Sequence, residues 1–340
     1  MEAVHRVTEQ TGAMQARLER VAAHLYAAPI YIMCGPHRSA LFWIELMTPT
    51  PSYQDAMFET ADGLHLEYRD YPALGDQDKL PVLCLHGLTR NLRDFEDLAP
   101  RIAAQGHRVI TASQRGRGRS DWDPDPSHYQ PAHYAQDMIG LLDRLKIDTA
   151  IFVGTSMGGL MTMVVAALAP SRIAAVVLND IGPELDPVGI GRIQQYAGRA
   201  GEHDSWAAAA AYVREVNEHA FPDETTDAFW LDFARRTHRE DPSGRIIPEC
   251  DPAVGEVIRN ASEPVPDLWP LFAALKPLPT LLVRGAISDL LAESTVAKML
   301  QLKPDMAVSR VSQVGHAPFL TEQDAWQALS RFLEKTCRVR

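Results

Sequence analysis

The clearest pattern in the chain is an alternation of short apolar runs with longer runs of helix-forming residues between positions 80 and 180. Short apolar, β-branched runs are typical of strands that are buried on both faces, and longer periodic runs are typical of helices. Strands are expected at 81–85, 108–112, 149–153 and 173–179. This order predicts an α/β fold with a doubly wound, mostly parallel sheet.

Similar patterns extend the sheet at both ends. Residues 57–71 alternate around Asp62-Gly63, a turn signal, which predicts a β-hairpin. Apolar runs at 279–283 and 306–311 predict the last two strands.

The pattern changes after Asp180, because residues 184–270 contain no convincing strand. Helical stretches are expected there near 187–199, 204–219 and 224–238. We therefore predict a core formed by 53–183 and 271–340, with an inserted all-helical cap at 184–270.

Residues 1–52 stand apart as an N-terminal extension that is helical or poorly ordered. A helical stripe comes first and a run of prolines follows. The stripe is Met14, Leu18, Val21 and Leu25, and the prolines are Pro29, Pro36, Pro49 and Pro51. The segment either packs on the body or on a second subunit, or is read-through from a start site placed too early. In the second case Met47 or Met57 is a natural start.

Composition narrows the class of protein. A 46% apolar content is ample for a core, and a net charge of −11 argues against nucleic acid and against an anionic membrane surface. The chain has no apolar run long enough to span a membrane and no secretory signal pattern, so a cytoplasmic protein is expected, compatible with a homo-oligomer. The cysteines are scattered, which fits free thiols: Cys34, Cys84, Cys250 and Cys337. No ligand-spaced motif predicts a metal, and no cofactor is expected.

Candidate chemistry begins at Ser156, in the run Gly154-Thr155-Ser156-Met157-Gly158 between a predicted strand and a predicted helix. This is a G-x-S-x-G nucleophile elbow in its proper context. The glycines allow strand and helix to pass close together, and the turn places the hydroxyl at a helix N-terminus. There the backbone N–H of Met157 can stabilise developing negative charge.

Three other strand ends carry the remaining candidates. His86-Gly87 follows the strand at 81–85, so that the N–H of Leu88 is expected to be the second oxyanion donor. Asp289 lies just past the strand at 279–283, and His316 follows the strand at 306–311. The order Ser, Asp, His is typical of one class of serine hydrolases.

These motifs, together with Arg115-Gly116-Arg117-Gly118-Arg119-Ser120, resemble those of the α/β-hydrolase superfamily, from about Ala56 to the C-terminus. Within it the chain is similar to the cap-bearing esterase, lactonase and C–C hydrolase group. Ser113 departs from the family's usual Asp, at a position that is usually structural.

The resemblance implies Ser156 as nucleophile, His316 as general base and then acid, and Asp289 as the acid that orients His316. Asp180, just past the strand at 173–179, is the alternative acid. His86 is the alternative histidine, although the resemblance gives it a supporting role beside the oxyanion loop. The implied reaction is acyl-enzyme hydrolysis of a small to medium carboxylic ester or lactone. Alternatives are a C–C bond hydrolase of a ring-cleavage diketone, an acyltransferase on the same triad, and a non-catalytic binding protein on a hydrolase scaffold.

Overall fold

A computed structural model describes residues 52–75, 79–259 and 266–336 of the chain. By its internal contacts the chain divides into residues 1–48 and 49–340. The predictions for the N-terminal stripe, Cys34 and Cys337 lie outside the described residues. The other two cysteines, Cys84 and Cys250, are free thiols, as expected.

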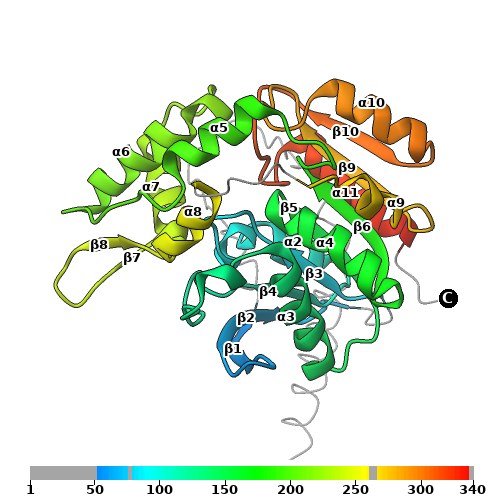
Figure 1. The fold of residues 1–340 in the computed structure, drawn as a ribbon, viewed down its shortest axis with the longest axis horizontal. Helices are drawn as coiled ribbons and strands as arrows, with labels where there is room; N and C mark the ends of the chain where they lie inside the picture. The colour runs from blue at the N-terminus through cyan, green and yellow to red at the C-terminus, as the bar shows by residue number, and fades with distance from the viewer. Residues whose placement is uncertain (1–51, 76–78, 260–265, 337–340) are drawn as a thin grey trace, which may run out of the picture. The chain divides into compact units, whose positions relative to one another are not determined.

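The core is an eight-stranded sheet with the order β1-β2-β4-β3-β5-β6-β9-β10 (Figure 1). Its strands are β1 Gln54–Glu59, β2 His65–Tyr71, β3 Val82–Leu85, β4 Val109–Ala112, β5 Ala150–Thr155, β6 Ile173–Asn179, β9 Thr280–Gly285 and β10 Ala307–Val311. Only β2 pairs antiparallel, with β1 and with β4, and the remaining pairs are parallel. The predicted α/β fold with a mostly parallel sheet is confirmed.

Helices cover both faces of this sheet. One face packs against α3 Pro131–Arg144, α4 Met157–Leu168, α9 Trp269–Ala273 and α10 Glu293–Leu302. The other packs against α2 Leu98–Ala104 and α11 Gln323–Thr336. Short 3-10 turns connect elements at η1 Leu92–Phe95, η2 Pro126–His128 and η3 Pro170–Arg172. Because the central strands are buried on both sides, they read as continuous apolar runs in the sequence.

The segment between β6 and β9 forms a separate group of elements (Figure 1, upper left). It contains α5 Pro187–Tyr196, α6 Trp206–Asn217, η4 Glu218–Ala220, α7 Asp227–Thr237 and α8 Pro252–Arg259. Its apolar centre includes Phe221, Trp230 and Phe233, each at most 5% exposed. We call this group, residues 187–259, the cap.

The prediction of an all-helical cap is wrong in one respect. Two short strands, β7 His238–Glu240 and β8 Ile246–Pro248, form an antiparallel hairpin. Each strand is only three residues long, which is too short for an alternating pattern to stand out in the sequence. The hairpin turn at Gly244, with φ of +85°, uses a backbone conformation that glycine adopts without strain.

Among the described residues, no helix is long and apolar enough to cross a membrane.

Candidate active site

The turn between β5 and α4 holds Ser156 in a rare backbone conformation, with φ 52° and ψ −115°. Glycines two positions before and two positions after Ser156 make this tight turn possible. A Cβ atom on Gly154 would lie 2.4 Å from the carbonyl oxygen of Gly158, and one on Gly158 would lie 2.1 Å from the carbonyl oxygen of Leu85. Such contacts are too short for any side chain. The strand, the turn and the helix therefore fit together only with glycine at these two positions, as the G-x-S-x-G pattern predicts.

A chain of hydrogen bonds leads away from the Ser156 hydroxyl. Nε2 of His316 lies 2.8 Å from Oγ of Ser156, and Nδ1 of His316 lies 2.8 Å from a carboxylate oxygen of Asp180. The three residues come from the ends of β5, β10 and β6, which are brought to the same edge of the sheet because these strands are parallel. Ser156 and His316 thus lie together as the sequence predicts.

The carboxylate at His316 is that of Asp180, which was the alternative acid. Asp180 directly follows β6 and is fully buried. Its Oδ1 accepts the N–H of Gly285 at 2.9 Å, and its Oδ2 accepts the hydroxyl of Ser288 at 2.6 Å in addition to His316. These bonds fix the position of the carboxylate beside Nδ1, from where it can orient the imidazole.

The prediction that Asp289 orients His316 is wrong. The loop after β9 turns so that Ser288 faces Asp180, while the Asp289 carboxylate binds Arg192 of α5 with N–O distances of 2.6 and 2.9 Å. Burial alone would raise the pKa of Asp289, but the hydrogen bond and charge of Arg192 outweigh it and lower that pKa. Asp289 is therefore an anion that pairs with a residue of the cap.

Two backbone N–H groups lie beside Ser156 without a partner. Leu88 follows the His86-Gly87 turn, and a Cβ atom on Gly87 would lie 3.7 Å from Cβ of Ser156. Met157 is the first residue of α4. Within the described part of the chain, no group accepts a hydrogen bond from either N–H. An N–H group without a partner can donate to an oxyanion, which is the role that the sequence predicts for Leu88 and Met157.

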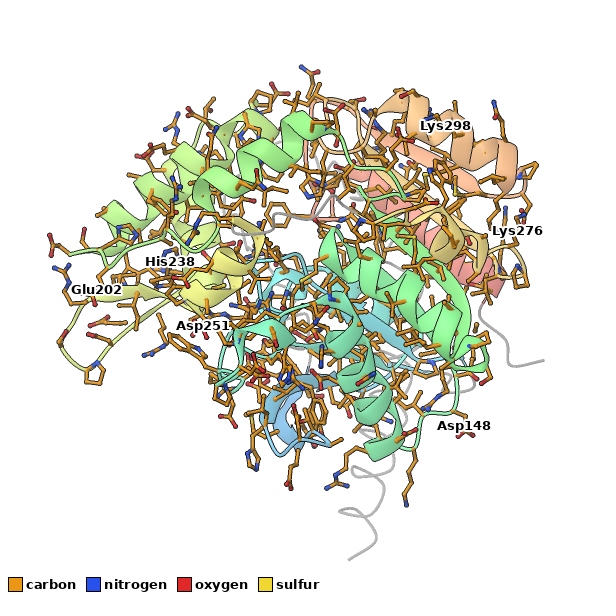
Figure 2. The ribbon with its side chains drawn as sticks, in the orientation of Figure 1. Asp148, Glu202, His238, Asp251, Lys276 and Lys298 are labelled. Atoms are coloured by element: carbon orange, nitrogen blue, oxygen red, sulfur yellow. The ribbon has the colours of Figure 1, made fainter. Side chains whose placement is uncertain are left out.

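A pocket with a volume of about 130 Å³ opens above Ser156 and His316. The core lines it with the segment 87–90 and the segment 316–319, and the cap lines it with side chains from α5, α6 and α7. Several of these are apolar or aromatic: Ile193, Tyr196, Tyr212, Val213, Val216 and Phe233. His238, at the start of β7, also lines it. Figure 2 labels His238 among the side chains of the cap. The hydroxyl of Ser156 is therefore reached through a mostly apolar space between cap and core.

Comparison with known protein families identifies the chain. A family model described as alpha/beta hydrolase fold matches residues 81–323. The chain belongs to the α/β-hydrolase family.

Named relatives within this family act on different substrates. The chain is 34% identical over 274 residues to a 3-hydroxybutyrate-oligomer hydrolase of Cupriavidus necator, a match that covers 75% of this chain and 88% of the relative. It is 28% identical over 237 residues to a 2-(acetamidomethylene)succinate hydrolase of Mesorhizobium japonicum, covering 69% and 81% of the two chains.

The crystal structure of an alpha/beta hydrolase from Novosphingobium aromaticivorans is similar to most of this chain. Its TM-score is 0.77 at 42% identity, over 83% of this chain and 98% of that one. These matches establish a hydrolase.

Two buried residues of this α/β hydrolase bind the backbone of the turn at Gly87 and Leu88. Arg117 is fully buried and donates from Nε to the carbonyl oxygen of Leu88 at 2.9 Å. His86, also fully buried, has Nδ1 2.7 Å from the carbonyl oxygen of Gly87 and accepts the N–H of Gln114 at Nε2. These bonds require a neutral ring with its proton on Nδ1. Burial lowers the pKa of His86 to about 3, which fits that form.

The supporting role expected for His86 agrees with these contacts, whereas the positioning of Leu88 by Arg117 was missed. The sequence shows only an Arg-Gly repeat at 115–119, for which local ion pairs and hydrogen bonds to loops are the natural interpretation. All three arginines agree with this interpretation, since Arg115 pairs with Asp137, Arg119 pairs with Glu67 and Arg117 bonds the Leu88 loop, although the sequence does not show which loop each one contacts. Nothing in the pattern distinguishes Arg117 from the other two.

The hydrolase holds one described cluster of potential metal ligands, formed by Asp62, Asp123 and His128, whose ligand atoms lie within 4.8 Å of one another. Arg115 already donates to it, at 2.8 Å to Asp62 and 2.5 Å to Asp123. A guanidinium cation therefore balances this cluster.

Proposed function

We propose that the chain is a serine-dependent carboxylic ester hydrolase, lactones included, that works through an acyl-enzyme. The observation that carries this proposal is the hydrogen-bonded series Ser156, His316 and Asp180 at the floor of the pocket. A serine hydroxyl is a weak nucleophile, and a histidine oriented by a buried carboxylate is the arrangement that activates it.

In the first half of the reaction, Nε2 of His316 takes the proton of Ser156 as Oγ attacks the ester carbonyl. The resulting oxyanion lies between the N–H groups of Leu88 and Met157. In serine hydrolases, removing one such donor lowers kcat by about 10² to 10³. His316 then gives its proton to the departing alcohol oxygen. The ester C–O bond breaks, and the acyl group remains on Oγ.

In the second half, water replaces the alcohol. His316 takes a proton from the water as its oxygen attacks the acyl carbonyl, and returns that proton to Oγ of Ser156 as the acid leaves. Asp180 stays ionised throughout and stabilises the imidazolium of His316 that forms twice in each cycle. No group beyond these residues and water is needed to balance the reaction.

One relative favours an ester substrate built from hydroxy acids. The relative with 34% identity is named for 3-hydroxybutyrate oligomers, whose units are joined by carboxylic ester bonds. We therefore propose short hydroxy-acid oligoesters as the first substrates to test, alongside p-nitrophenyl esters of rising chain length and simple lactones.

The test uses wild type and Ser156→Ala. A fluorophosphonate should label Ser156 in the wild type and leave the variant unlabelled, and hydrolysis of the ester panel should be lost in the variant. Labelling of another serine, or turnover that survives in Ser156→Ala, would overturn the mechanism. Preferred cleavage of a ring-fission diketone would favour the C–C hydrolase alternative, and transfer of the acyl group to an added alcohol the acyltransferase.

A further inference from the structure

Arg90 places a guanidinium in the wall of the pocket, close to the nucleophile. A Cβ atom on Gly87 would lie 3.6 Å from Cγ of Arg90 and 3.7 Å from Cβ of Ser156, so both side chains border Gly87. The side chain is 20% exposed. Arg90 lines the pocket together with Ser156 and His316.

The guanidinium of Arg90 is held in place but is only partly used as a donor. Its Nε donates to Asp94 at 2.7 Å, while its Cζ lies 4.0 Å from the ring centroid of Phe233 and 5.3 Å from that of Phe319. No described residue accepts a hydrogen bond from its terminal nitrogens. An arginine has five N–H donors in a fixed plane, so four of them remain for another partner.

Neighbouring arginines of the cap boundary differ from Arg90 in this respect. Arg236, whose Cζ lies 5.9 Å from the Phe319 ring centroid, donates to both Asp97 and Asp232. Arg93 donates to Glu249 and to two backbone carbonyl groups. Neither lines the pocket. Of these three arginines, only Arg90 lines the pocket, and only Arg90 has both terminal nitrogens without a described acceptor.

We infer that Arg90 binds a carboxylate of the substrate, and that the enzyme prefers esters with a free carboxylate a few bonds from the cleaved bond. This inference rests on the proposed ester hydrolase function. The two terminal nitrogens of a guanidinium match the two oxygens of a carboxylate. The bond to Asp94 and the contacts with the rings of Phe233 and Phe319 limit the movement of this guanidinium. Ion pairing inside a largely apolar pocket is less screened than at the surface.

Hydroxy-acid oligoesters have the required shape. In a 3-hydroxybutyrate dimer, four bonds separate the ester carbonyl carbon from the terminal carboxylate carbon, a reach of roughly 5 Å. Both curated relatives are named for compounds that carry carboxyl groups, a hydroxybutyrate oligomer and a substituted succinate. The inference places this carboxylate at Arg90 and the ester carbonyl at Ser156, which line the same pocket.

The experiment compares two substrates that differ only in charge. One is the 3-hydroxybutyrate dimer with a free carboxylate, and the other is the same dimer with its terminal carboxyl capped as the primary amide. For wild type, kcat/KM should be at least tenfold higher on the free acid. In Arg90→Met the ratio of the two kcat/KM values should fall to about one, because the charged hydrogen bonds that favour the free acid, which contribute about 1.5–3 kcal/mol, are lost. Arg90→Lys should keep part of the ratio, since it keeps the charge without the planar fork.

Arg236→Met is the matched control, because it removes an arginine near the same Phe319 ring but outside the pocket lining. The ratio should stay at the wild-type value in this variant. A ratio that falls equally in Arg236→Met, or that is unchanged in Arg90→Met, would overturn the inference while the ester hydrolase function stands. If wild type cleaves neither dimer nor any p-nitrophenyl ester, the proposed function fails and the inference fails with it.

A second measurement does not depend on a folded variant. With wild type and p-nitrophenyl acetate, 3-hydroxybutyrate should inhibit competitively, and 3-hydroxybutyramide should inhibit at least tenfold more weakly. Equal inhibition by the two compounds would contradict a carboxylate site at Arg90.

Discussion

Arg192 and Asp289 form a two-point ion pair that joins the first helix of the cap to the loop after β9, with N–O distances of 2.6 and 2.9 Å. Backbone bonds continue the same contact, from the N–H of Gly189 to the carbonyl of Asp289 and from the N–H of Asp186 to the carbonyl of Leu290. Asp289, which the sequence predicts to orient His316, thus binds the cap. Substitutions of Asp180 and Asp289 can therefore show which carboxylate supports catalysis.

Asp180→Asn should lower kcat on p-nitrophenyl acetate by about 10³ to 10⁴, because an amide would hold His316 in the wrong tautomer. Asp289→Asn should stay within tenfold of wild type on this small ester, since its carboxylate contacts only the cap. Steady-state kinetics of the two variants decide between the acids. The reverse order of effects would return the role to Asp289.

Ser288→Ala should reduce kcat about tenfold. It removes the hydroxyl that donates to Asp180 at 2.6 Å, and a single such bond contributes about 1–1.5 kcal/mol. Ser309→Ala is the control, because Ser309 lies on β10 with a hydroxyl contact of 3.5 Å to the backbone of Asp324. Similar rates for the two variants would mean that Ser288 does not support the acid.

Gly154→Ala should destabilise the fold severely, since the new methyl group would lie 2.4 Å from the carbonyl oxygen of Gly158 and 2.6 Å from the nitrogen of Gly159. The matched change is Gly140→Ala in α3, where nothing lies within 4 Å of a new Cβ atom. There alanine should stabilise the folded state by about 0.5–1 kcal/mol, because it is the better helix former. Urea unfolding of both variants measures the contrast, and a Gly154→Ala protein as stable as wild type would contradict the close packing of β5 and α4.

His86 should make the protein less stable in acid. Its pKa is about 3 in the folded protein against 6.5 for the free side chain, so below pH 6.5 the unfolded chain takes up a proton that the folded protein does not. The contribution of His86 to the free energy of unfolding is therefore fully present above pH 6.5 and is lost as the pH falls toward 3. Between pH 7 and pH 5 the loss due to this group is about 2 kcal/mol.

The measurement is the free energy of unfolding at pH 7 and pH 5 for wild type and for His86→Gln. Buried His238, with a pKa of about 4, contributes a similar slope in both proteins, so the difference between the slopes isolates His86. His86→Gln is expected to be less stable at both pH values but to lose about 2 kcal/mol less on acidification. Equal losses would mean that His86 is protonated in the folded state.

Much of this molecule could be predicted from local patterns. The buried strands are continuous apolar runs, and the elbow at Ser156 is fixed by glycines that admit no other side chain. His316 and Ser156 could be paired because both follow parallel strands, whose carboxyl ends meet at one edge of the sheet.

The acid could not be chosen in the same way, because Asp180 and Asp289 both follow strand ends. What separates them is how far each lies beyond its strand: Asp180 directly follows Asn179, the last residue of β6, while Asp289 comes four positions after Gly285. Those extra residues let the loop turn toward Arg192, a partner about a hundred positions away in the sequence. The β7–β8 hairpin and the bond from Arg117 to Leu88 were missed for the same reason, since they depend on contacts that no local pattern carries.

The loop that carries His316 is bound to the cap as well as to the core. The N–H of Gly315 donates to the carbonyl oxygen of Ala220 at 2.7 Å, and Phe319 stacks on Phe221 with ring centroids 5.2 Å apart. The cap is therefore not an exchangeable module that only selects substrates. A chimaera that replaced residues 187–259 with the cap of a relative would leave the base loop without its anchor, unless residues 315–319 were transplanted with it.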